Sequence, residues 1–472
     1  MDRRSFLGSI GVAAVALQLP RPGTAVAKTT ALVTSIAQLQ SAINSATAGT
    51  TITLANGTYA VSSAITVSGR NGTSSAPITI QAETRGGVTL TGSQSFVMSN
   101  SSYITVSGFV FQQTSSFDLP SSCTRIRITR NDFQLGSAAS HWLVVRGDDV
   151  KVDRNVFHDK STIGCYLVID GPSSTVMAKR TYILRNHFRD HSFSGSNGGE
   201  PIRLGVSSRA LDTAGATVEY NLFERADGDP EGISVKSSGN TIRYNTIRDS
   251  LGGIVLRHGN NNRVEGNHLL AGSNGIRIYG NDHLIVNNYL GDLGSAGIVL
   301  GSGTVRDHTS DESAESRKGN DAPDRVTIVL NTLRNNAEGV VGESQRTLAP
   351  LACRISDNLL VGSSGSLVDM PYLGGITWSG NILWGSASNG NIPSGGFTRA
   401  DPKLSAGTDG VYRLGTGSAA INATSMNHAS RVTDDVDGHA RTAPYDVGAD
   451  EYSTATPVRR PLTAADVGPS AT

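Results

Sequence analysis

A short phrase that recurs along the middle of the chain constrains the fold more than any other feature. It consists of apolar residues, an asparagine, one further residue and then a large apolar residue, as in ITRNDF, VEYNLF and IVNNYL. Ten copies place the asparagine at positions 131, 155, 186, 221, 245, 267, 288, 331, 358 and 381. The steps between copies are 24, 31, 35, 24, 22, 21, 43, 27 and 23 residues. A basic step of 21 to 24 residues with occasional insertions indicates a solenoid.

The kind of solenoid follows from the residues around each asparagine. Apolar and polar residues alternate there, as in GIVLRHGN and GIRIYGN, which predicts short strands. Leucine-rich repeats need several leucines at fixed places, and these phrases lack them. Asparagine tolerates a left-handed φ, and its side chain can bond its copy in the next coil. We therefore expect an all-β, single-stranded parallel β-helix whose asparagines form a structural ladder.

The ends of a solenoid need covers, because open coils expose core and unpaired strand edges. Residues 33–46 carry apolar residues at helical spacing, and we expect them to form an N-terminal cap helix. The ladder stops near residue 400, so residues 401–452 are expected to form a loop-rich C-terminal close. Residues 453–472 are expected to be a loosely packed tail. The polar stretch 303–324 accounts for the step of 43 residues and is interpreted as an excursion beside a groove.

The first 27 residues have the pattern of a bacterial export signal. Arg3 and Arg4 precede an apolar run over residues 8–19, and small residues end at Ala27. This pattern predicts a twin-arginine signal peptide over 1–27 and a secreted protein, with a β-helix domain over 28–452. The alternative is a membrane anchor, but twelve residues are too few to span a bilayer, which takes about 20.

The composition narrows the partners. The 40 basic and 40 acidic residues give a formal net charge of zero, which argues against binding nucleic acid through bulk charge. No later segment is long and apolar enough for a membrane span. The three cysteines cannot build a disulfide framework. We expect a monomer with no nucleic-acid or membrane partner.

Three consecutive coils depart from the small polar residues expected on the outside of a β-helix. When GISVKSSGN, GIVLRHGN and GIRIYGN are aligned by their leading glycines, Lys236, Arg257 and Tyr279 share one outward column. Neighbouring coils lie about 4.8 Å apart, so the two cations repel each other, and the fold does not require that. Asp229 and Glu231 lie at a corner just upstream. The alternative is a solvated charged face, but the convergence of these groups favours a functional site.

One coil earlier, NGGEPIRLG places Asn197, Glu200 and Arg203 on the same side. The oxygens of Asn197, Asp229 and Glu231 suit Ca²⁺ rather than zinc. A basic column beside a calcium ion suits an anionic substrate such as a polysaccharide of uronic acids. Its C5 proton becomes removable when a cation stabilises the charge that develops on the carboxylate.

A lysine can take that proton once it is neutral, and the neighbouring positive charges disfavour its charged form. The 4-linked sugar then leaves, and β-elimination gives an unsaturated product. Two other hypotheses stay open: a β-helix glycoside hydrolase acting on pectin-like chains, and a solenoid that binds polyuronate without catalysis. A hydrolase needs paired carboxylates across the scissile bond, whereas the acidic residues here share one corner.

The segments NGGEPIRLG, DPEGISVKSSGN and LRHGN resemble polysaccharide lyase family 6, the family of alginate lyases and chondroitinase B. SAPITIQAETRGGVTLTG near the N-terminus and DDVDGHARTAPYDVGADEY near the C-terminus extend the resemblance over nearly all of the chain after residue 27. The resemblance implies a right-handed β-helix and a carbon–oxygen lyase. It also implies Lys236 as base, Arg257 as acid and one Ca²⁺ held by Asn197, Asp229 and Glu231.

Further groove positions follow from the same comparison. The residues that we expect to bind substrate are Arg203, His258, Tyr279, Arg277 and Glu200. Asp229 stands where many members have Glu, and arginine is a weak proton donor, so Tyr279, His258 or water could share the role of acid. Few further basic residues flank the groove, which favours alginate over dermatan sulfate.

Overall fold

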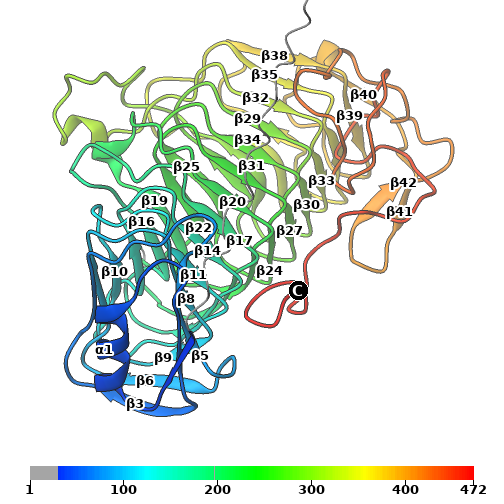
Figure 1. The fold of residues 1–472 in the computed structure, drawn as a ribbon. Coiled ribbons are helices and arrows are strands. Elements are labelled where there is room, and N and C mark those ends of the chain that lie inside the picture. The colour runs from blue at the N-terminus through cyan, green and yellow to red at the C-terminus, as the bar shows by residue number, and fades with distance from the viewer. Residues whose placement is uncertain (1–29, 196) are drawn as a thin grey trace, which may run out of the picture.

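The computed structural model describes residues 30–195 and 197–472, so the predicted signal peptide over 1–27 lies outside the described residues. The chain winds into coils that each add one strand to three long parallel sheets (Figure 1). Hydrogen bonds join each strand to the strand of the next coil, as expected for a parallel β-helix. Among the described residues, no helix has the length and apolar character needed to cross a membrane.

Sheet 1 has 14 strands. They are β1 (Thr30–Val33), β2 (Thr51–Leu54), β5 (Ile78–Ala82), β8 (Ile104–Ser107), β11 (Arg127–Thr129), β14 (Lys151–Asp153), β17 (Tyr182–Leu184), β20 (Thr217–Glu219), β23 (Thr241–Arg243), β26 (Arg263–Glu265), β29 (Leu284–Val286), β32 (Thr327–Val329), β35 (Cys353–Ser356) and β38 (Ile376–Ser379).

Sheet 2 also has 14 strands and follows sheet 1 in each coil. They are β3 (Gly57–Val61), β6 (Val88–Gly92), β9 (Phe109–Phe111), β12 (Asp132–Phe133), β15 (Val156–Lys160), β18 (His187–His191), β21 (Leu222–Ala226), β24 (Thr246–Arg248), β27 (His268–Leu270), β30 (Tyr289–Gly291), β33 (Thr332–Arg334), β36 (Leu359–Val361), β39 (Asn381–Trp384) and β40 (Phe397–Arg399).

Sheet 3 has 12 strands and completes the coil. They are β4 (Ile65–Ser68), β7 (Phe96–Ser99), β10 (Phe117–Leu119), β13 (Leu143–Val145), β16 (Leu167–Ile169), β19 (Ile202–Gly205), β22 (Glu231–Lys236), β25 (Gly253–His258), β28 (Ile276–Ile278), β31 (Ala296–Leu300), β34 (Glu338–Gly342) and β37 (Val368–Asp369). A small antiparallel pair, β41 (Leu404–Ala406) and β42 (Tyr412–Leu414), follows the last coil.

The ten asparagines form the predicted ladder at the corner between sheets 1 and 2. The side-chain amide of each of the first nine donates to the next asparagine's carbonyl oxygen, with N···O distances such as 3.0 Å from Asn221 to Asn245 and from Asn245 to Asn267. All ten are buried. The expectation of a left-handed φ on the asparagine itself was wrong, because the residue before it takes that conformation, as Tyr220 does at 52° and Tyr244 at 56°. The asparagine side chain therefore caps the turn that its neighbour makes.

The large apolar residue two places after each asparagine points into the core. Phenylalanines stack in successive coils, with ring centroids 4.6 Å apart between Phe133 and Phe157 and 5.0 Å apart between Phe188 and Phe223. The same repeat thus fixes both the corner and the core packing.

The helix predicted over 33–46 is found as α1 (Ile36–Ser45), which begins after Ser35, whose hydroxyl accepts a hydrogen bond from the Gln38 amide. Leu39 and Ile43 bury their side chains in the main core. Its role as a cap stays a prediction. Three short 3₁₀ helices occur among the described residues: η1 (Ser207–Arg209), η2 (Ser316–Lys318) and η3 (Ser394–Gly396).

The expectation of a loosely packed tail over 453–472 was wrong. Leu462 and Val467 bury their side chains against Leu222 of an earlier coil. Carbonyl oxygens of the tail accept hydrogen bonds from Arg130 and Arg154. The segment lies back along the solenoid, as the red trace near β24 indicates (Figure 1).

We expect Asn245→Ala to lower the free energy of unfolding by roughly 2–4 kcal/mol, because the change leaves buried backbone and side-chain groups of adjacent coils without partners. Urea denaturation followed by circular dichroism measures the change. Asn44→Ala, at an exposed position of α1, serves as control and should change stability by less than about 0.5 kcal/mol. An equal change in the free energy of unfolding for both substitutions would contradict a stabilising role of the ladder.

Candidate active site

Lys236 ends β22 on sheet 3, and its ammonium group contacts a buried carboxylate. Its Nζ donates to Oε1 of Glu200 at 3.1 Å. Glu200 precedes β19 in the previous coil and is only 1 % exposed. Burial acts to raise the pKa of this carboxyl, but the positive charges of Lys236 and Arg203 outweigh it and hold the pKa below its usual value. Glu200, predicted to bind substrate, is thus a buried partner that fixes the lysine.

The predicted column of Lys236, Arg257 and Tyr279 is wrong in its register. The inward residues align as expected, with Ile233 opposite Ile254 and Val235 opposite Leu256. The pairing then slips, and Lys236 lies opposite His258. This irregularity offsets the lysine from Arg257 along the coil, so the two cations are not stacked directly on each other.

Tyr279 is fully buried and does not face solvent, contrary to the expectation. Its hydroxyl group contacts both carboxylate oxygens of Glu343, at 2.9 and 2.7 Å. The guanidinium groups of Arg257, Arg277 and Arg346 lie 5.4, 5.1 and 5.3 Å from its ring centroid. The tyrosine is therefore the floor of a basic cluster, and it lies out of direct reach of a bound sugar.

Arg257 lies between the acidic corner and this cluster. Its Nε is 3.9 Å from Oε1 of Glu231, and its Nη1 donates to the side-chain oxygen of Asn320. Burial lowers the pKa of the Arg257 guanidinium, and the charges of Arg277 and Arg346 add to this shift against the opposing effect of Glu231. A lowered pKa makes this group a better proton donor than a solvated arginine.

The acidic corner is organised by Asp229. One carboxylate oxygen accepts hydrogen bonds from the amides of Gly198 and Gly199, at 2.8 and 3.4 Å, and the other accepts from the amide of Glu231 at 2.9 Å. These bonds bring the loop that carries Asn197 against the start of β22. Burial raises the pKa of the Asp229 carboxyl, and the negative charges of Glu200 and Glu231 raise it further.

The donor set of this corner fits a hard cation. Asp229 forms no ion pair with a described residue. Its carboxylate and those of its acidic neighbours repel one another, and a divalent cation would offset this repulsion. Asn197 is exposed on the adjoining loop and offers an amide oxygen. Among the described residues, the group of three acidic or histidine side chains close enough together to hold a metal ion lies elsewhere, at Asp435, Asp437 and His439 near the C-terminus.

Arg203 and His258 come from the coils on either side of Lys236, and their role in binding substrate stays a prediction. Arg203 is on β19, and His258 ends β25 opposite the lysine. The Nε of Arg203 and the Nδ1 of His258 are buried without a hydrogen-bond partner among the described residues. Burial and the charges of Arg257 and Lys236 lower the pKa of His258 to about 3. The imidazole is therefore neutral and has hydrogen-bonding capacity to spare.

Sequence reasoning missed several residues that complete the site. Glu343 and Arg346 come from the loop after β34, and Asn320 comes from the excursion 303–324. The excursion contacts the site through Asn320, which accepts from Arg257, and its Arg317 donates to the carbonyl of Ser208 in η1. Only the step of 43 residues in the repeat pointed to this region, and no motif marked Glu343 or Arg346.

The comparisons with known proteins concern the family and the fold. The sequence profile of the chondroitinase B family matches residues 33–298, and a profile of the right-handed β-helix region matches residues 231–383. The first match covers more than half of the chain, so the chain belongs to the chondroitinase B family, within polysaccharide lyase family 6. No curated protein matches the chain.

Solved structures share the fold. One is the family 6 alginate lyase AlyGC, at 26 % identity and a TM-score of 0.74, over 82 % of this chain and 56 % of AlyGC. The chain thus spans little more than half the length of that relative. A mannuronic acid-specific family 6 lyase from human gut microbiota gives 24 % identity and a TM-score of 0.71, over 78 % of this chain and 90 % of that one. A family 6 alginate lyase in complex with a trisaccharide gives 22 % identity and a TM-score of 0.67, over 90 % of this chain and 97 % of that one.

The buried histidine gives a prediction for acid stability. Folded His258 stays neutral down to about pH 3, whereas the unfolded chain takes up a proton at this residue near pH 6.5. Between these values the unfolded state binds more protons, so the free energy of unfolding falls as the pH falls. We expect His258→Gln to lose less stability than the parent between pH 7 and pH 4.5, measured by chemical denaturation. An identical loss in both proteins would contradict this assignment.

Proposed function

We propose that this protein is a secreted lyase that cleaves 1,4-linked uronic-acid polysaccharide, alginate above all, by β-elimination. The observation that carries the proposal is the placement of Lys236 on buried Glu200, beside Arg257 and next to an acidic corner. A base, a cationic group and a set of hard oxygen ligands thus meet on one sheet of the solenoid. Membership of a lyase family and the alginate lyases among the similar structures support it.

Lys236 acts as the base in its neutral form, whose amine removes the C5 proton. The Glu200 carboxylate orients Nζ and stabilises the ammonium group that forms when the amine accepts the proton. Since Glu200 is buried and held by a protein cation, this stabilisation does not require water to reorganise.

Arg257 acts at the leaving oxygen. It is held between Glu231 and the ring of Tyr279, and burial favours transfer of its proton. His258 is neutral and lies opposite Lys236, so it positions substrate through hydrogen bonds. Arg203, which lies in the neighbouring coil, binds a carboxylate of the substrate. Tyr279 contributes indirectly, because its ring positions the arginines that surround it.

Asn197, Asp229 and Glu231 would hold one Ca²⁺. When bound, the ion neutralises the substrate carboxylate as charge develops on it. Asp229, one methylene shorter than the Glu found in many members of the family, accepts hydrogen bonds from three backbone amides. Its carboxylate therefore shapes the corner and would offer its remaining lone pairs to the ion.

Charge pairing at the groove favours a carboxylated substrate over a sulfated one. Arg277 lies 3.3 Å and Arg346 lies 2.8 Å from carboxylate oxygens of Glu343, and Lys236 is paired with Glu200. This leaves little excess positive charge for the additional sulfates of dermatan sulfate. Export through the signal at 1–27 and a monomeric state complete the proposal.

We expect Lys236→Ala to lower the rate of product formation on alginate by roughly 100- to 10,000-fold while the fold is retained. The assay follows the ultraviolet absorbance of the unsaturated uronate. Lys151→Ala, which removes a lysine on sheet 1, is the matched control and should leave the rate unchanged. New reducing ends without ultraviolet absorbance would indicate a hydrolase instead, and near-normal activity of Lys236→Ala would exclude the base assigned here.

Calcium should stabilise the protein as well as activate it. In chelator-treated protein, Ca²⁺ at a hundredfold excess over its dissociation constant should raise the free energy of unfolding by about 2.7 kcal/mol. Asp229→Asn should abolish most of this gain, measured by thermal unfolding with and without Ca²⁺. Asp118→Asn, at an exposed position of β10 on the same sheet, should leave the gain intact. If Ca²⁺ leaves the melting temperature of the parent protein unchanged, the calcium site proposed here is wrong.

A further inference from the structure

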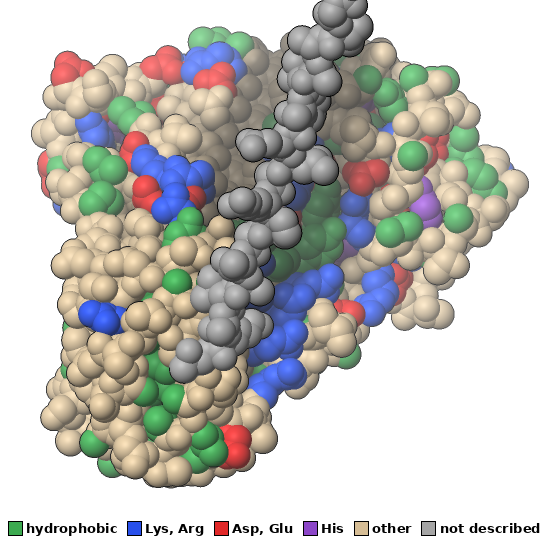
Figure 2. Space-filling view, viewed as in Figure 1, with side chains coloured by type: hydrophobic (Ala, Val, Ile, Leu, Met, Phe, Trp, Pro, Cys, Tyr) green, Lys and Arg blue, Asp and Glu red, His purple; other side chains and the backbone are tan. Residues whose placement is uncertain are grey.

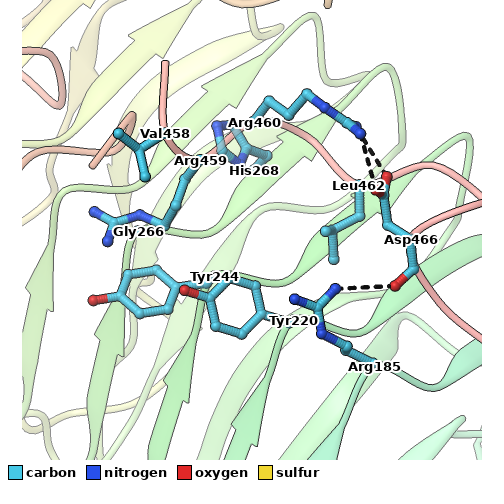
Figure 3. A pocket seen from close by; sticks show the side chains of 10 residues that line it. All are labelled: Arg185, Tyr220, Tyr244, Gly266, His268, Val458, Arg459, Arg460, Leu462 and Asp466. Atoms are coloured by element: carbon cyan, nitrogen blue, oxygen red, sulfur yellow. Dashed lines mark hydrogen bonds and ion pairs between the residues drawn. The ribbon is translucent and has the colours of Figure 1, made fainter. Parts of the chain in front are cut away.

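A pocket of about 270 Å³ lies at the corner between sheets 1 and 2, across the solenoid from the sheet that carries Lys236 (Figure 3). One wall is formed by four turn residues from successive coils, and the other wall is formed by the C-terminal segment. The lining residues are Arg185, Tyr220, Tyr244, Gly266, His268, Val458, Arg459, Arg460, Leu462 and Asp466. In this region a band of basic side chains gathers beside the C-terminal segment (Figure 2).

The turn residues build an aromatic surface. Tyr220 and Tyr244 precede ladder asparagines in adjacent coils, and their ring centroids are 5.2 Å apart. Gly266 occupies the equivalent place in the next coil, where an added Cβ would lie 2.7 Å from the Tyr244 ring. The absence of a side chain there lets the Tyr244 ring lean over the next coil. The two half-buried rings thus offer one extended apolar face.

Cationic groups border this face. Arg185 lies 5.5 Å from the Tyr220 ring centroid, and Arg459 lies 4.2 Å from that of Tyr244. Arg460 is paired with Asp466 at 2.9 Å, and Arg459 is paired with Asp434. Arg185 donates to the main-chain carbonyl of Asp466 at 3.2 Å and forms no ion pair with a described residue. Its charge is therefore available to an anion.

A buried polar atom of a residue that lines the pocket also lacks a partner. His268 is 3 % exposed, and its Nε2 has no hydrogen-bond partner among the described residues. Burial lowers the pKa of His268 to about 3, so the imidazole is neutral and can exchange a hydrogen bond with a hydroxyl group. A buried polar atom without a partner is unfavourable, so a hydroxyl group that reaches it would be bound favourably.

We propose that this pocket is a second, non-catalytic site that binds one uronate residue of the polysaccharide. The flat aromatic face suits the sugar ring, Arg185 suits the carboxylate, and His268 suits a hydroxyl group. The volume lies just below the range of about 300–1,000 Å³ that encloses drug-sized ligands, which matches a single sugar ring. The identity of the sugar rests on the proposed function, whereas the binding of an anionic sugar does not require turnover.

A site on a different face from the catalytic groove would hold a long chain near the enzyme between cleavages. Binding one part of a polymer raises the effective concentration of the rest at the groove. Short oligomers cannot reach both places, so the pocket should affect polymer and oligomer differently.

The test compares Arg185→Gln with Arg154→Gln. Both arginines occupy the same turn position in adjacent coils, and each donates to a main-chain carbonyl of the C-terminal segment, but only Arg185 lines the pocket. We expect Arg185→Gln to raise KM for alginate polymer roughly five- to tenfold and to leave kcat and KM for a trisaccharide unchanged. Arg154→Gln should match the parent on both substrates. Tyr220→Ala should behave as Arg185→Gln does, and thermal unfolding checks that each variant is folded.

Binding is measured separately by migration in gels that contain alginate, with all variants in the inactive Lys236→Ala background. Arg185→Gln and Tyr220→Ala should be retarded less than the Lys236→Ala parent. Equal retardation of all variants, or no retardation of the parent, would overturn the pocket proposal. The gel needs no catalysis, so reduced retardation in a protein that proves inactive on alginate would sustain the pocket and reject only the lyase proposal.

Discussion

The asparagine ladder is the interaction on which the rest of this molecule depends. Along the ladder, from Asn131 to Asn381, the side-chain amides are satisfied by the next asparagine and by backbone carbonyls. Each of these coils must therefore start its strand of sheet 2 at the same place. A slip of one residue would bury an unsatisfied amide and turn the core phenylalanines outward. Because the ladder fixes this corner in every coil, the loops at the other two corners can vary in length. The excursion 303–324 leaves one of these corners.

The candidate site uses that freedom. Glu200, Asp229 and Lys236 come from two successive coils whose relative position is fixed by the ladder, while Asn320 and Arg346 come from insertions that fold back over the groove. Burial shifts the pKa values of the groups in the site. It keeps His258 neutral, lowers the pKa of Arg257 and raises that of Asp229. The rigid coils provide placement, and the partial enclosure by loops provides the low-dielectric surroundings that give these charges their effect.

The sequence predicted the parallel β-helix, the ladder and the inward stacking of Ile233 on Ile254, because these depend on a repeat that is visible along one chain. It could not predict that Lys236 lies opposite His258, because a local irregularity in pairing leaves no mark in the spacing of the residues. Nor could it place Glu343 on Tyr279, a contact between residues 64 apart, of which Glu343 follows β34 and Tyr279 follows β28. The packing of Leu462 and Val467 was missed for the same reason, since two apolar residues in a polar segment do not reveal what they cover.

The way the C-terminal segment is packed affects how the whole solenoid unfolds. In a repeat protein each coil normally contacts only its neighbours, so the ends can fray while the middle persists. Here the amide of Leu462 donates to the hydroxyl of Thr246, the amide of Gly468 donates to the carbonyl of Arg185, and Arg130 donates to the carbonyl of Pro469. These bonds tie the end of the chain to coils far from the last one. Detaching the segment therefore uncovers several coils together, and the linear array gains the cooperativity of a globular domain.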